Sequence, residues 1–349
     1  MKSSASLALL IGFAATVMFP AALPAADQVV RRSDRAVLRG DLTAMTVASL
    51  TIKLQNGQTQ EVPVSDVFSV KFDMEPPTLS QALAAERSGS LDFALQKYKE
   101  IQLEYSGEDK RLVTDLKFLI ARAQVKLALA NPAEVANATK AISTFRTENP
   151  NNFRFLEASL LEADLLAQDP AQADAAKAIL TKVQESPVKG YTLQAGVQLG
   201  MLLLKSKDNA GALAAFDKVV TDSQNDPNAV SALYDGMLGK ALCLKADSKA
   251  DEAIAILDEV INKASESETR TLARAWILKG DSFREKSLPK DALMAYLHVD
   301  ILYASEPSEH AEALYHLASL WGPAGHQNRA DDAKAMLTSK YPNSPWAKR

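Results

Sequence analysis

The 349-residue sequence contains a single cysteine, Cys243, so no disulfide bond can form within the chain. Cys243 lies in the apolar run ALCL, where a cysteine is typical of a small core residue and not of a reactive thiol. With no cysteine near the N-terminus, a lipid-anchored N-terminal cysteine is excluded as well. A chain of this length can stabilise itself by burial of apolar surface alone.

Aromatic residues make up only 6% of the sequence, and 39 basic residues face 43 acidic ones. This balance gives no electrostatic attraction to nucleic acid or to an anionic membrane. The signatures HExxH, GxSxG and GxGxxG and the phosphate-binding P-loop are all absent, and the four histidines show no metal-ligand spacing. We therefore predict no catalytic residue, no metal, no cofactor and no nucleic-acid partner.

One long apolar run, Leu7 to Phe19, stands near the N-terminus, after Lys2 and before Pro20. Its 13 residues are short for a membrane-spanning helix, and small residues follow it. Residues 1–26 are interpreted as a secretory signal peptide, with an uncleaved N-terminal anchor as the alternative. We expect a periplasmic or secreted protein that is not a lipoprotein.

Residues 27–73 alternate between apolar and polar side chains, which is typical of half-buried strands. In SLTIKLQ, for example, Leu50 and Ile52 face one side and Thr51 and Lys53 the other. The dipeptide Asn56-Gly57 is a strong hairpin signal. We predict strands at about 27–32, 36–43, 49–55, 59–64 and 67–72 that curl into a small barrel, because an open hairpin alone is marginally stable.

From Thr78 onward the apolar period becomes helical, and an alanine recurs at separations of 37 to 44 residues. These alanines are Ala94, Ala138, Ala175, Ala212, Ala253, Ala292 and Ala333, and a large apolar residue follows each by four positions. Twelve positions earlier, Ala82, Ala163, Gly200, Ala241 and Gly280 are small. Such columns are typical of antiparallel helix pairs that cross closely at small residues.

This pattern resembles the tetratricopeptide repeat, and Trp276, Gly280, Phe283, Ala292 and Tyr296 follow its signature. The units are longer than the usual repeat of about 34 residues, and HEAT-type repeats are the alternative. The resemblance implies a mainly α-helical solenoid of about seven helical pairs within residues 78–349. The pairs are expected at about 78–104, 108–147, 151–185, 190–222, 227–264, 267–302 and 307–341.

Two further resemblances concern the ends of the chain. The strand spacing and Gly40 make residues 27–73 similar to small Sm-like or SH3-like barrels, which we expect to cap the first repeat, with a hinge at 74–77. The C-terminal YPNSPWA resembles the end of exported bacterial repeat proteins of the Tol–Pal coordinator and outer-membrane assembly type. The same comparison implies a peripheral association with envelope complexes.

A tetratricopeptide-like superhelix implies a non-enzymatic scaffold that binds a protein or peptide on its concave face. The alternative is a self-assembling envelope protein in which the β-module docks onto the repeats of another copy. The concave positions that the family implies mix apolar and charged side chains, and packing between repeats is the other role open to the apolar ones. These positions are Glu157, Leu160, Asp164, Gln194, Val197, Met201, Asp235, Leu238, Leu242, Arg274, Ile277, Asp281 and Arg284.

Overall fold

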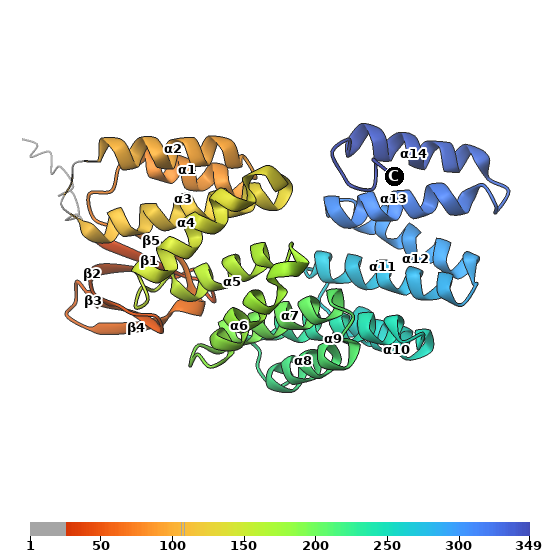
Figure 1. The fold of residues 1–349 in the computed structure, drawn as a ribbon, viewed down its shortest axis with the longest axis horizontal. Helices are drawn as coiled ribbons and strands as arrows, with labels where there is room; N and C mark the ends of the chain where they lie inside the picture. The colour runs from red at the N-terminus through yellow and green to blue at the C-terminus, as the bar shows by residue number, and fades with distance from the viewer. Residues whose placement is uncertain (1–25, 106, 108) are drawn as a thin grey trace, which may run out of the picture.

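The structure is a computed structural model that describes residues 26–105, 107 and 109–349. The signal peptide predicted for residues 1–26 lies outside the described residues, apart from Ala26. A five-stranded sheet is followed by helices stacked in a curved array (Figure 1). The mainly α-helical solenoid with a small antiparallel β-module is thereby confirmed. Among the helices described, none has the length and apolar character that a membrane span requires.

The sheet contains five antiparallel strands in the order β4-β3-β2-β1-β5. They are β1 (Asp27–Arg31), β2 (Val37–Met45), β3 (Ser49–Leu54), β4 (Thr59–Pro63) and β5 (Val67–Lys71), with the 3-10 turn η1 (Val64–Asp66) before the last strand. Leu50 and Ile52 are fully buried, as their alternation predicts. Gly40 of β2 is required by close packing, because a Cβ there would lie 1.9 Å from the carbonyl oxygen of Lys53.

Fourteen helices form seven consecutive pairs in the described part of the chain. The pairs are α1 (Pro77–Arg87) with α2 (Leu91–Glu104), α3 (Lys110–Ala130) with α4 (Val135–Glu148), α5 (Phe155–Leu166) with α6 (Ala173–Gln184), α7 (Lys189–Lys205) with α8 (Asn209–Ser223), α9 (Val230–Ala246) with α10 (Ala250–Lys263), α11 (Thr269–Glu285) with α12 (Pro289–Leu302), and α13 (Pro307–Trp321) with α14 (Gln327–Lys340). The 3-10 turns η2 (Pro132–Glu134) and η3 (Pro170–Gln172) precede α4 and α6.

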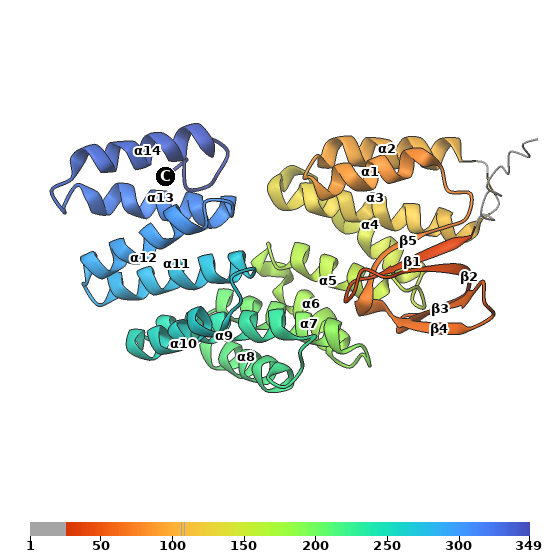
Figure 2. The same cartoon turned by 180° about the vertical axis from the view of Figure 1, so that it is seen from behind.

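The first helices of successive pairs also contact one another, from α3 through α5, α7, α9 and α11 to α13. They form a layer of their own, which we call the inner face, and the second helices cover its other side. Figure 2 shows that the stack turns, so that α1–α4 and α13–α14 lie on the same side of the molecule.

The β-sheet contacts the solenoid beyond the first repeat, which the sequence predicted it to cap. The buried carboxylate of Asp27 accepts hydrogen bonds from the backbone of Leu42 and Asp73, and the guanidinium of Arg111 on α3 lies 2.7 Å away. Near the start of α7, a Cβ on Gly190 would lie 2.7 Å from the Cβ of Ser65. Because the stack curves, the sheet contacts both the second and the fourth helical pair.

The alanine columns mark the helix crossings, with one change of register. Six of the seven predicted alanines are buried, but Ala175 is exposed. Its neighbour Ala176 takes the buried position, and Leu180 fills the adjoining space in place of Ile179. The 3-10 turn η3 lengthens the connection before α6, and a sequence alignment of the columns does not reveal this shift.

The crossing between α11 and α12 is made by an aromatic ring over a glycine. Tyr296 is fully buried, and a Cβ on Gly280 would lie 2.7 Å from its Cε1 atom. Gly200 and Gly239 face the ring of Phe216 in the same way. The glycines are therefore required where a large ring from a neighbouring helix occupies the space of a side chain.

The C-terminal turn packs against the last pair. The hydroxyl of Tyr341 and Nδ1 of His310 are 2.7 Å apart, and the ring of Trp346 lies 5.1 Å from that of Tyr315. These contacts cover the end of the apolar core with the chain's own residues.

We predict that Gly280→Ala destabilises the fold by about 1–3 kcal/mol, because the buried ring of Tyr296 must move to admit a methyl group. Thermal and urea unfolding would measure the loss. Gly236→Ala on α9 is the comparison and should cost less, since a Cβ there would meet methyl carbons of Val220 and Val219 at 3.0 and 3.1 Å and the backbone oxygen of Phe216 at 3.4 Å, and no aromatic ring. Equal stability of the two variants would contradict the ring-over-glycine crossing.

Candidate functional site

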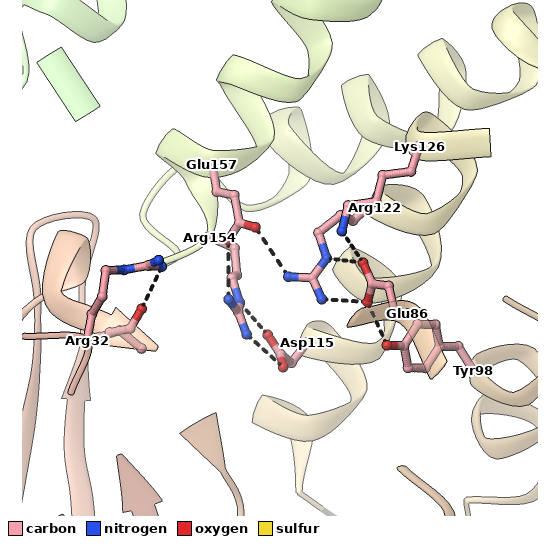
Figure 3. Close-up of polar contacts among 9 residues, drawn as sticks. Arg32, Glu86, Tyr98, Asp115, Arg122, Lys126, Arg154 and Glu157 are labelled. Atoms are coloured by element: carbon pink, nitrogen blue, oxygen red, sulfur yellow. Dashed lines mark hydrogen bonds and ion pairs between the residues drawn. The ribbon is translucent and has the colours of Figure 1, made fainter. Parts of the chain in front are cut away.

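The inner face begins with a buried ion network around Glu86 of α1 (Figure 3). Arg122 Nη2 lies 2.7 Å from one carboxylate oxygen of Glu86, and Lys126 Nζ lies 2.8 Å from the other. The hydroxyl of Tyr98 donates a further hydrogen bond of 2.7 Å. Only 2% of the Glu86 side chain is exposed, so each of these partners compensates for lost hydration.

The network continues to α5 through Arg154. Arg154 Nε is 2.8 Å from Asp115 of α3, and its Nη1 is 3.2 Å from Glu157. Arg122 Nη1 lies 3.2 Å from the other oxygen of Glu157. Glu157, which the sequence assigned to partner binding, is thus held between two arginines and joins α3 to α5. Three carboxylates face three cations, so this stretch presents no net charge.

Burial by itself would raise the pKa of Glu86. The hydrogen bond and charge of Arg122, with the hydrogen bonds of Lys126 and Tyr98, outweigh burial and lower that pKa to about 2. Glu86 is therefore ionised at neutral pH, and its ionised form stabilises the folded chain.

Charged side chains at the far end of the inner face also pair with one another. Lys245 of α9 lies 2.8 Å from Asp281 of α11, and Arg274 of α11 lies 2.8 Å from Glu312 of α13. Burial alone would raise the pKa of Asp281, but the charge of Lys245 outweighs it and lowers that pKa. Two predicted site residues, Arg274 and Asp281, therefore connect neighbouring repeats.

Arg284 contacts a neutral histidine. Its Nη1 atom lies 2.9 Å from Nδ1 of His316, whose ring stacks on Tyr296 with centroids 4.6 Å apart. Burial, opposed by Asp281 and reinforced by Arg284, lowers the pKa of His316 to about 4. His316 is therefore uncharged at neutral pH, and Arg284 donates to its Nδ1. The side chain of Arg284 remains exposed to solvent along part of its length.

The middle of the inner face has a different character. Five residues make up what we call the middle stretch: Asp164 of α5, Gln194, Gln198 and Met201 of α7, and Asp235 of α9. Within the described ranges, the carboxylates of Asp164 and Asp235 have no ion-pair or hydrogen-bond partner. Burial raises the pKa of Asp164 to about 6. Met201 is 48% exposed, and Gln194 is also open to solvent.

The apolar candidates belong to the core. Leu160, Leu238 and Ile277 are 6%, 7% and 0% exposed, so Leu238, which the sequence assigned to partner binding, offers little surface in this structure. Each of the three belongs to an apolar core cluster. Val197 and Leu242 are half-buried and pack against such clusters. Packing between repeats was the alternative role for these residues, and their burial favours it.

Gln198 and the partners of Glu157 were not predicted as functional residues. Arg122 and Lys126 stand inside the apolar run FLIARAQVKLALA, and a charge within such a run is the available signal of a buried ion pair. For Gln198 the sequence offers no comparable signal. In residues 26–105, 107 and 109–349, no cluster of three or more His, Cys, Asp or Glu side chains is placed to hold a metal ion.

Solved structures share this architecture. A tetratricopeptide repeat protein from Parabacteroides merdae matches with a TM-score of 0.52 and 15% identity, covering 78% of this chain and 96% of that one. RapI in its apo form matches with a TM-score of 0.50 and 11% identity over 78% of each chain. A Rap protein complexed with competence and sporulation factor matches with a TM-score of 0.51 and 12% identity, covering 77% and 76%.

The chain therefore has a tetratricopeptide-repeat fold, as the small-residue columns predicted, and identities this low establish the fold alone. No protein-family model and no curated protein matches the sequence. The resemblance of the C-terminal end to Tol–Pal coordinators, and that of the strands to Sm-like barrels, stay predictions.

We predict that Glu86→Gln costs about 3 kcal/mol of folding free energy at pH 7, because it removes the carboxylate that Arg122 and Lys126 share. The folded pKa lies below the ordinary value of 4.5, so this stabilisation is present above pH 4.5 and is lost toward pH 2. Urea unfolding at several pH values would measure it. Glu100→Gln, at an exposed ion pair on α2, is the control with little expected effect.

We predict the opposite sign for Asp164→Asn, which should stabilise the fold by about 1–2 kcal/mol at pH 8. The folded pKa of about 6 exceeds the ordinary value of 3.8, so the ionised carboxylate destabilises the folded state above pH 6. The gain should therefore shrink as the pH falls from 6 toward 3.8. Asp174→Asn, at an exposed position on α6, is the control. A loss of stability at pH 8 would instead mean that Asp164 has a stabilising partner.

Proposed function

We propose that the protein is a non-enzymatic scaffold whose middle stretch binds a protein or peptide partner. The observation that carries the proposal is the contrast along the inner face. Both flanking stretches use their charges to join repeats, whereas Asp164 keeps a partly buried carboxylate without a partner among the described residues. Perturbed ionisable groups that do not stabilise the fold are typical of functional sites.

The fold supports the same proposal. Curved helical stacks offer an extended inner surface for binding other chains. One structure with this fold was solved as a complex with competence and sporulation factor, which is a precedent for binding by such a stack.

We further propose that the protein is exported to the periplasm or secreted, where it would act on envelope complexes as coordinators of the Tol–Pal type do. The apolar run Leu7 to Phe19, followed by small residues, supports export. The alternative, self-assembly through the β-module, has less support, because the sheet already packs on α3 and α7 of its own chain.

Site-specific photo-crosslinking tests the scaffold proposal. A benzoylphenylalanine at Gln194 or at Met201, both exposed on α7, should crosslink the same protein from an envelope extract. Matched probes at Asp174 and Thr181, exposed on the second helix α6, should not. Asp281 and Arg284 are less suitable for this test, because Asp281 is paired with Lys245 and Arg284 with His316. Equal labelling from both helices, or none from α7, would count against the proposal.

A further inference from the structure

The chemistry of the middle stretch identifies the kind of partner that it fits. On α5, α7 and α9, each lysine already has a partner: Lys189 pairs with Asp226, Lys240 with Asp217 and Lys245 with Asp281, while the ammonium of Lys205 lies 2.6 Å from the carbonyl oxygen of Ala167. Asp164 and Asp235 are the ionised groups on these three helices for which the described residues provide no ion pair or hydrogen bond.

A third acceptor lies between these carboxylates in the stack. The side-chain oxygen of Gln198 on α7 is buried from solvent and has no hydrogen-bond partner among the described residues. An unpaired buried acceptor costs about 1–3 kcal/mol, and a ligand's donor would recover that free energy once rotation of the half-buried Gln198 side chain exposes the oxygen. Three successive first helices thus each offer a hydrogen-bond acceptor that no described donor satisfies.

Asp235 is exposed to solvent, and the surrounding charges do not form an ion pair with it. Glu268 and Arg270, at the start of α11, act on Asp235 with opposite sign, and the guanidinium of Arg270 makes no hydrogen bond to it. For Asp164, burial is the one influence on the pKa that is resolved, so no cation among the described residues compensates its charge. A ligand that complements the charge of the middle stretch is therefore positively charged.

The places of Asp164, Gln198 and Asp235 along their helices set the distance between the three acceptors. Asp164 follows the buried Ala163 by one residue, Gln198 precedes Gly200 by two, and Asp235 precedes Ala241 by six. At about 1.5 Å per residue and about 9 Å between adjacent helices, the three acceptors mark a diagonal of roughly 20 Å. About six residues of extended chain span that distance.

We propose that the middle stretch binds an extended segment of another protein carrying two lysine or arginine residues about six positions apart. The ammonium or guanidinium groups pair with Asp164 and Asp235, and a polar side chain or backbone N–H between them donates to Gln198. This inference rests on the proposed scaffold function and adds to it the charge and spacing of the partner.

Fluorescence anisotropy with labelled peptides tests the proposal on the chain from residue 26 onward. The probe Gly-Lys-Ala-Ser-Ala-Ser-Ala-Lys-Gly is compared with the same peptide carrying glutamate, and with leucine, in place of both lysines. The lysine peptide should bind, and Asp164→Asn and Asp235→Asn should each weaken it by about tenfold, as expected for loss of one charged hydrogen bond. Asp174→Asn should leave it unchanged.

The outcomes separate the two proposals. Binding of the glutamate or leucine peptide in preference to the lysine peptide, or no binding of the lysine peptide at 1 mM, overturns the inference. The inference is also overturned if Asp164→Asn and Asp235→Asn both bind the lysine peptide as tightly as the unchanged protein does. If the crosslink at Met201 forms and is likewise insensitive to these variants, the scaffold function stands without the charge preference. If no crosslink forms from α7, the scaffold function fails and the inference fails with it.

Discussion

The close approach of helices at small residues determines the geometry of this protein. Where Phe216 covers Gly200 and Tyr296 covers Gly280, the two helices of a pair lie at the distance that a bare backbone permits. Seven such helix pairs follow one another in the described chain, and from α3 onward their first helices contact one another and create an inner face. The charged side chains acquire their partners only because this layer exists, since most pairs join residues on different helices.

The ion pairs in turn divide the inner face into regions with separate roles. A neutral network of three carboxylates and three cations, which includes Glu86, Arg122 and Glu157, holds α1, α3 and α5 together. Lys245 and Asp281 hold α9 against α11 in the same manner. A charge used in this way is fully compensated and has little free energy to gain from a ligand. Between the two regions, the carboxylate of Asp164 and the side-chain oxygen of Gln198 have no partner among the described residues.

The elements were predictable from the sequence because their signals are local. The alternation that buries Leu50 and Ile52 and the four-residue spacing from Ala292 to Tyr296 each lie within one or two elements. The site was less predictable, because the partner of a charge lies one repeat away: 36 residues separate Lys245 from Asp281 and 38 separate Arg274 from Glu312. Family positions identified residues of the inner face, but they could not tell a charge that joins repeats from one without a partner.

Asp164 shows why the distinction between paired and unpaired charges matters for function. A half-buried carboxylate without a cation lowers the stability of the folded chain at neutral pH, and asparagine would avoid that loss with nearly the same shape. Glu86 is more deeply buried than Asp164, yet its pKa moves in the opposite direction because Arg122 and Lys126 accompany it. The same fold therefore supplies cations where a carboxylate has a structural role. At Asp164 the described residues supply none, and the cation that completes this site is then expected to come from the partner.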